Sequence, residues 1–245
     1  MWLRRARPAL ENRRHRLPRG ISARASGKFD RVRFLVTAGP TREPIDPVRF
    51  ISNRSSGKMG YAIAEAAIKA GHDAVLISGP VEIDPPPSAK VIPVSTSAEM
   101  FDAVHQQVTK CDVLVMCAAV ADYKPVAVFT EKLKKRDAKL SLELIPTRDI
   151  LSSLPKIRKY LVVGFAAETE SIATNAQKKL LKKNCDMIVA NDARIGMETD
   201  ENEVEIFFRN GKTKRISRAA KKIIARELVK IFADAREKGL TKKTQ

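Results

Sequence analysis

The sequence predicts an α/β fold, with an open, doubly wound, mostly parallel sheet of Rossmann-like type and an antiparallel C-terminal hairpin. From Val32 onward, short runs rich in β-branched residues alternate with segments of helical periodicity, as expected when helices cover both faces of a parallel sheet. Near the C-terminus, Asn210-Gly211 separates two apolar runs and is suited to a type I′ hairpin turn. The chain has 245 residues, of which 44% are apolar, enough for one sizeable core.

The strands and helices can be placed in order along the chain. Parallel strands are expected at residues 33–37, 73–78, 90–94, 112–117, 161–165 and 187–190, and hairpin strands at 203–208 and 212–216. A helix is predicted at 97–110, because Thr96 and Glu99 have capping-box spacing. A long basic amphipathic helix is predicted at 217–238. Its apolar side is formed by Ile223, Ile224, Leu228 and Ile231.

The formal charge of +18 is concentrated at the two ends of the chain. Residues 1–30 carry nine Lys/Arg against two acids, and residues 209–245 carry thirteen against three, whereas the body holds twenty-four against twenty-three. Neither end has the interleaved aromatic residues that stack on single-stranded nucleic acid. We therefore expect no nucleic-acid binding, and the basic ends are interpreted as solvated.

The predicted domain organisation is a basic N-terminal extension at 1–30, one catalytic domain at 31–238 and a tail at 239–245. The extension is interpreted as a disordered arm, with a transit-like peptide or a misread start as alternatives. The longest apolar run, 113–121, is about half of a bilayer-spanning helix, so no membrane segment is expected. The three cysteines follow neither metal-ligand nor redox spacing, which favours reduced, buried thiols in a cytoplasmic protein.

Two predicted loops, 38–56 and 123–136, are several times longer than usual strand-to-helix connections. Both leave strands at their carboxyl ends, where open α/β sheets bind ligands, so we expect the loops to converge on one crevice. The first ends in the small-residue segment 52–60, which leads into a helix running to about Ala70. Its backbone N–H groups could hold a phosphate at the helix N-terminus, although an N-cap with packing glycines explains the pattern equally well.

The segment 52–60 matches neither common phosphate-binding signature. A Walker A loop requires glycine where this chain has Ser52, and Ala38-Gly39-Pro40-Thr41 supplies no G-x-G-x-x-G after the first strand. The second strand ends in Ser78-Gly79-Pro80, without the carboxylate that holds a nucleotide ribose. Because these signatures are missing, a nicotinamide-dependent reductase is kept only as an alternative function.

Charged residues beside the predicted crevice suit an anionic substrate. Asp122 follows the fourth strand, and the cationic run 131–136 lies in the second long loop. Lysine ammonium groups placed there would stabilise a triphosphate or a leaving pyrophosphate. The alternative is a solvated surface for the lysines and a capping role for Asp122.

Several motifs together resemble phosphopantothenate-cysteine ligase over residues 31–230. The motifs are Thr37 to Arg49, Ile51-Ser52-Asn53, Ser55-Ser56-Gly57-Lys58-Met59-Gly60, Ala118 to Tyr123, Lys132-Leu133-Lys134-Lys135, Val163 to Thr169 and Ala190-Asn191-Asp192. The resemblance implies a ligase that joins 4′-phosphopantothenate to cysteine in coenzyme A biosynthesis. In it, CTP activates the substrate carboxylate as an acyl-cytidylate with release of pyrophosphate, and the cysteine amine then displaces CMP.

The resemblance also implies roles for individual residues. Asn53 and Lys132 would be catalytic, and Lys132 would also bind the nucleotide. Arg49, Ala118 and Ala119 would hold phosphopantothenate. The other nucleotide-binding residues would be Ser55, Ser56, Gly57, Lys58, Asp122, Arg148, Asp149, Ile150, Phe165, Lys179 and Lys183.

Further expectations concern the cofactor, the partners and the nucleotide. Mg²⁺ would be held mainly by phosphate oxygens, and no flavin is expected, because the flavin-dependent decarboxylase half of the bacterial bifunctional proteins is missing. A homodimer in the cytoplasm is expected, with a separate decarboxylase as a candidate partner. The resemblance to the bacterial rather than the eukaryotic form of the family, in Ala121-Asp122-Tyr123 and Lys132-Leu133-Lys134-Lys135, implies CTP rather than ATP. The segment 146–150 departs from the Lys-Asn-Pro-Asp-Ile of bacterial relatives, which bears on the base preference.

Overall fold

The computed structural model describes residues 31–135, 139–196 and 199–241. The predictions for the basic extension at 1–30 lie outside this part of the chain. No helix within the described residues combines the length and the apolarity needed to cross a bilayer.

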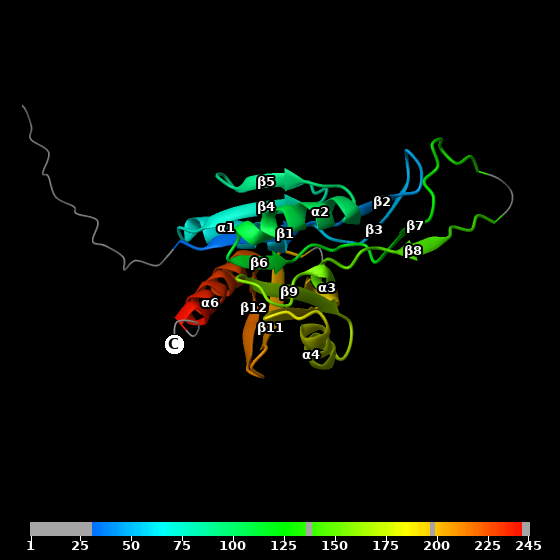
Figure 1. Ribbon diagram of the computed structural model, residues 1–245. Helices are drawn as coiled ribbons and strands as arrows, with labels where there is room; N and C mark the ends of the chain where they lie inside the picture. The colour runs from blue at the N-terminus through cyan, green and yellow to red at the C-terminus, as the bar shows by residue number, and fades with distance from the viewer. Residues whose placement is uncertain (1–30, 136–138, 197–198, 242–245) are drawn as a thin grey trace, which may run out of the picture. The chain divides into compact units, whose positions relative to one another are not determined.

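The core of the fold is a mixed sheet (Figure 1). Its strands occur along the chain in the order predicted from the sequence. In space, the strands run β12 (Thr213–Ala220), β11 (Glu201–Phe208), β10 (Met187–Asp192), β9 (Leu161–Glu168), β6 (Val113–Met116), β1 (Arg33–Ala38), β4 (Asp73–Ser78) and β5 (Lys90–Pro93). The strands from β10 to β5 are parallel, and β11 and β12 add an antiparallel hairpin. The predicted fold class is therefore confirmed.

Helices cover both faces of this sheet, and each face has its own apolar core. On one face, α1 (Lys58–Lys69) and α6 (Lys221–Thr241) pack together over Phe34 and Val36 of β1. On the other face, α2 (Ser97–Gln107), a 3₁₀ turn at Val108–Lys110, α3 (Ile150–Ser153) and α4 (Ile172–Lys182) cover Leu35. Alternate residues of each strand thus belong to opposite layers, as the period of two requires.

The start of the last helix differs from the prediction. Residues 217–220 belong to β12, which pairs with β11 as far as Ala220, so α6 begins only at Lys221. Of the predicted apolar side, Ile224 and Leu228 are fully buried, whereas Ile223 is 48% exposed, because it lies about 100° around the helix from Ile224. Pairing with a neighbouring strand outweighed the local helical pattern. At its other end, α6 continues through Thr241 into the predicted tail.

The hairpin turn is also not of the predicted two-residue type. Phe208 N–H donates to the Lys212 carbonyl at 2.9 Å, which leaves a three-residue loop at 209–211. Only Gly211 has a positive φ, 81°, as in a three-residue loop that ends in a left-handed glycine, whereas type I′ would require it of Asn210 as well. By contrast, the N-cap of α2 is confirmed, since Thr96 Oγ1 accepts from Glu99 N–H at 3.2 Å.

The two long loops form an arm beyond the carboxyl ends of the parallel strands (Figure 1). The arm contains the hairpin of β2 (Arg42–Pro44) and β3 (Phe50–Ser52) and the pair β7 (Tyr123–Pro125) and β8 (Leu144–Pro146). Its two parts meet at Asp46, a buried carboxylate that accepts from the N–H groups of Val48 and Arg49, each at 2.8 Å, and of Leu133 at 3.1 Å. The outer parts of the loops therefore converge on each other.

Candidate functional site

Two adjoining cavities form a cleft at the carboxyl edge of the sheet. The α1 cavity, of about 340 Å³, lies between the N-terminus of α1 and the ends of β6, β9 and β10. The α4 cavity, of about 730 Å³, lies between the end of β6, α3 and α4. Residues shared by both linings make the cleft continuous; they are Ala118, Val120, Asp122, Phe165 and Lys179.

The N-terminus of α1 forms one wall of the α1 cavity. Gly57, the N-cap, has a left-handed φ of 73°, which favours glycine. Ser55 Oγ accepts from Gly57 N–H at 3.3 Å, but no side chain caps the N–H groups of α1 within the described residues. A Cβ on Gly60 would lie 2.6 Å from the Ala38 Cβ, so this glycine lets α1 approach β1 closely. The wall can therefore offer backbone N–H groups to an anion.

The segment after β6 forms the floor shared by the two cavities. Buried Thr37 Oγ1 accepts from the N–H groups of both Cys117 and Ala118 at 3.1 Å, and Ala119 N–H donates to the Gly39 carbonyl at 2.9 Å. The N–H groups of Ala118 and Ala119 are thus already used inside the protein. These two residues can serve a ligand by close approach, but not as N–H donors.

Asn53 connects the two loops at the rim of the α1 cavity. Its side-chain amide donates to the Val120 carbonyl at 2.9 Å, while the residue remains exposed. This bond leaves the amide oxygen of Asn53 available to a ligand. Asp122, also exposed, is the one carboxylate among the described residues that line the α1 cavity.

Lys179 lies where the two cavities meet. Its ammonium donates to the Phe165 carbonyl at 2.7 Å. Burial lowers the pKa of Lys179, with Glu168 and other nearby carboxylates acting in the opposite direction. A half-buried ammonium at this position attracts anions more strongly than a fully solvated one.

The far wall of the α4 cavity is made by the segment leading into α3. Asp149 caps α3 by accepting from Ser152 N–H at 2.9 Å, and it also pairs with Lys183. The Arg148 guanidinium pairs with Asp102 at 3.0 Å and stacks 3.9 Å from the centre of the Phe101 ring. Arg148, Asp149 and Ile150 all line the α4 cavity, but the contacts with Asp102 and Phe101 hold the Arg148 guanidinium toward α2.

Three polar residues of the α1 cavity have no assigned role in the motif analysis. Asn191, Asn202 and Lys221 are all at least nine-tenths buried, and all line this cavity. The Lys221 ammonium donates to the Thr199 carbonyl at 2.5 Å, and burial lowers its pKa, with nearby Lys58 acting in the same direction. Asn202 carried no local sequence signal, because it lies between Glu201 and Glu203 and just outside the strand predicted at 203–208. Lys221 lacked one, because it was placed inside the predicted last helix.

Two predicted site residues lie on the arm and are absent from the described linings of both cavities. Arg49 pairs with Asp46 at 3.2 Å and donates to the Leu133 carbonyl, while Lys132 is exposed beside them. Within one chain, the structure brings together the remaining predicted site residues along the cleft but separates Arg49 and Lys132 from it.

The cysteine and the acidic residues of the cleft bear on two further functions, nucleophilic catalysis by a thiol and metal binding by side chains. Burial raises the pKa of the Cys117 thiol, which lines the α1 cavity, to about 12, so this sulfur stays protonated near neutral pH. Among the described residues, no group of three or more His, Cys, Asp or Glu side chains is positioned to hold a metal ion.

The fold and the cleft define an α/β protein with a polar cleft, lined by a helix N-terminus and lysine side chains, at the carboxyl edge of its sheet. The chain belongs to the family described as DNA/pantothenate metabolism flavoprotein C-terminal domain, whose model matches residues 29–235. This match confirms the family resemblance predicted from the motifs.

The curated relatives are bifunctional proteins named for coenzyme A biosynthesis. The "Coenzyme A biosynthesis bifunctional protein CoaBC" of Bacillus subtilis is 47% identical over 204 residues, which cover 81% of this chain and 50% of that protein. The Haemophilus influenzae protein of the same name is 43% identical over 209 residues, covering 84% and 52%. The chain therefore spans about half the length of these relatives.

Solved structures agree with the family. A crystal structure of the C-terminal domain of CoaBC is 42% identical and superposes with a TM-score of 0.74, covering 84% of this chain and 96% of that domain. A Cab2 mutant in complex with phosphopantothenate-cysteine has a TM-score of 0.74, covers 87% of this chain and 89% of that one, but is 16% identical. The second likeness establishes the shared fold alone.

Proposed function

We propose that this protein is the ligase that joins 4′-phosphopantothenate to L-cysteine in coenzyme A biosynthesis, using CTP. The observation that carries the proposal is the continuous cleft, in which the N-terminus of α1, Lys179 and Asp122 face one space. The names of the relatives, which refer to coenzyme A biosynthesis, support the same pathway for this chain.

The proposed reaction has two steps. First, a carboxylate oxygen of phosphopantothenate bonds to the α-phosphorus of CTP, and the bond to the bridging oxygen breaks, releasing pyrophosphate. Second, the cysteine nitrogen attacks the acyl carbon, the carbon–oxygen bond to CMP breaks, and the nitrogen loses a proton. The N–H groups of α1 and the ammonium of Lys179 would hold the phosphates, where fixed dipoles and charges stabilise developing negative charge.

The remaining residues of the cleft are assigned to orientation. Asn53 would hold the acyl intermediate through its amide, and Asp149, Ile150 and Phe165 would contact the nucleotide. Mg²⁺ would be held mainly by the phosphate oxygens of the nucleotide and would neutralise their charge, and Asp122, which lines the α1 cavity, would contact the nucleotide.

The arm supports a homodimer as the active form. Arg49 and Lys132 lie beyond the cleft of their own chain, on a structure held together by Asp46. In the proposed dimer, the arm of one subunit brings both residues to the cleft of its partner. Lys132 then meets the triphosphate, and Arg49 meets phosphopantothenate.

The direct test is incubation of the purified protein with phosphopantothenate, cysteine and Mg²⁺, with CTP and ATP supplied in separate reactions. Mass spectrometry should detect phosphopantothenoyl-cysteine and CMP, with a stronger signal from CTP. Pyrophosphate release that does not depend on phosphopantothenate would contradict the proposed function.

A further inference from the structure

A second polar cavity lies at the opposite edge of the sheet, where the parallel strands begin. It has a volume of about 390 Å³ and lies between the segment before β9, the segment before β10 and the C-terminal part of α6. Leu161, at the start of β9, lines it, whereas Ala167, near the end of the same strand, lines the α1 cavity. At about 3.3 Å per residue, the two cavities are about 20 Å apart along this strand.

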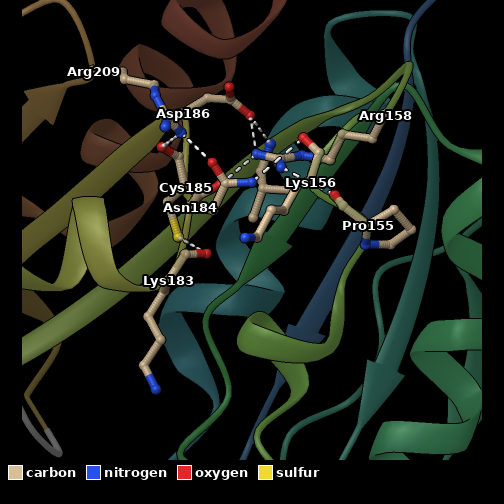
Figure 2. Close-up of polar contacts among 9 residues, drawn as sticks. Pro155, Lys156, Arg158, Lys183, Asn184, Cys185, Asp186 and Arg209 are labelled. Atoms are coloured by element: carbon tan, nitrogen blue, oxygen red, sulfur yellow. Dashed lines mark hydrogen bonds and ion pairs between the residues drawn. The ribbon is translucent and has the colours of Figure 1, made fainter.

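The lining of this amino-edge cavity is strongly cationic. It contains Lys156, Arg158, Lys159, Arg209 and Arg236 against one carboxylate, Asp186. That carboxylate is already engaged, since its Oδ2 accepts from the Arg158 guanidinium at 2.9 Å and from Val162 N–H at 2.8 Å. Figure 2 shows Arg158 and Arg209 converging on the segment from Asn184 to Asp186. The cavity therefore has an excess of positive charge.

Three residues that line this cavity also carry buried polar atoms without hydrogen-bond partners. Within the described residues, three buried side-chain polar atoms have no hydrogen-bond partner: Arg158 Nε, Tyr160 Oη and Arg236 Nε. All three residues line the amino-edge cavity. The Arg158 side chain is 7% exposed and Tyr160 is also 7% exposed, so these groups are built into the fold. Buried donors without partners are rare in folded proteins and call for a missing acceptor.

We propose that the amino-edge cavity binds a phosphate-class oxyanion, either inorganic or carried by a small metabolite. Such a ligand accepts hydrogen bonds on several oxygens at once, and guanidinium groups match its geometry. The site is separate from the cleft, and the proposal does not depend on the ligase activity.

The test is an NMR titration of the full chain with inorganic phosphate, pyrophosphate and glycerol phosphate at constant ionic strength. Backbone amide signals report the cavities separately, through residues 156–162 and 184–186 at the amino edge and 55–60 at the cleft. We expect a saturable change at the amino edge with its own dissociation constant, and the three probes distinguish free phosphate from a phosphate ester. Changes confined to 55–60 would overturn the proposal.

A matched pair of variants tests the charge. Lys156→Ala/Lys159→Ala removes two exposed cations from the cavity, and Lys212→Ala/Lys214→Ala removes two exposed cations from the hairpin. The first variant should raise the dissociation constant at the amino edge about tenfold, and the second should leave it unchanged. An equal loss in both variants would identify non-specific screening and overturn the site.

Tyr160→Phe tests the unsatisfied hydroxyl. Without a ligand, removing a buried hydroxyl that has no partner should leave the melting temperature unchanged or raise it. The additional thermal stabilisation that wild-type protein gains from phosphate should shrink in the variant, because one donor to the anion is lost. A Tyr160→Phe protein that gains as much stability from phosphate, and binds it as tightly at the amino edge, would refute the role of this donor.

Discussion

Asn53 stands on the rim of the cleft, with its amide nitrogen held by the Val120 carbonyl and its oxygen free to meet a ligand. Asn53→Ala should slow amide formation roughly 100-fold, as loss of a positioned polar group at a reacting centre does, while the acyl-cytidylate accumulates. Quenched-flow sampling with mass spectrometry measures both species. Asn210→Ala, which removes an exposed amide from the hairpin turn between β11 and β12, is the control. Normal amide formation in Asn53→Ala would remove the assigned role.

Lys179 gives the cleft a pH dependence. Because burial lowers its pKa, its positive charge is lost at a lower pH than that of an ordinary lysine, and nucleotide affinity should weaken as the pH rises through this range. Calorimetric titration with CTP at a series of pH values measures this. Lys179→Arg, which stays charged, should remove this pH dependence, and Lys179→Gln should bind about tenfold more weakly than the wild type at pH values where Lys179 is charged, with the difference disappearing as Lys179 becomes neutral.

The stability of the fold should change with pH in the opposite sense to nucleotide affinity. Between the lowered pKa of folded Lys179 and the ordinary value, the unfolded chain binds more protons, so the free energy of unfolding rises with pH. Lys178→Gln changes an exposed lysine of the same helix and should preserve both trends. A wild-type affinity that is flat across this range would show that Lys179 does not contact the nucleotide.

At the scale of the element, the approach of α1 to β1 depends on Gly60. A Cβ added to Gly60 would lie only 2.6 Å from the Ala38 Cβ, which is too close for two carbon atoms. Gly60→Ala should therefore lower the free energy of unfolding by about 1–3 kcal/mol and displace the anion-binding end of α1. Gly239→Ala in α6 has nothing within 4 Å of the new Cβ and should raise it by about 0.5–1 kcal/mol. Urea unfolding of both variants measures the contrast, and equal effects would contradict the packing argument.

The helices and strands also show which parts of the secondary structure can be predicted from local sequence patterns. The strands and α2 follow periodicity and capping residues that lie close together in the sequence. The start of α6 does not, because residues 217–220 have a helical pattern but pair with β11. Likewise, Asn210-Gly211 predicted a turn correctly but not its length, which the register of β11 and β12 decides.

At the scale of the whole molecule, the separation of Lys132 from the cleft of its own chain leads to a test of the proposed dimer. Asn53→Ala and Lys132→Gln should each be nearly inactive, the second because pyrophosphate release is lost. Co-expression of the two variants should restore about a quarter of the wild-type rate, since half of the dimers then contain one intact site. Lys110→Gln, an exposed lysine at the amino edge, replaces Lys132→Gln in the control mixture. Failure to recover activity in a verified mixed dimer would contradict the shared site.

The sequence alone determined the fold class, the positions of the parallel strands along the chain and the family, because hydrophobic periodicity and local motifs are properties of short segments. It also identified Asn53, Asp122 and Lys179, which lie in stretches that match the family. Only the tertiary structure decided that the N–H groups of Ala118 and Ala119 are used internally, and that Lys221 and Asn202 line the same cavity as Asn53. These facts depend on contacts between segments 80 or more residues apart, and the burial and hydrogen bonding of a residue are set by neighbours that its local sequence does not specify.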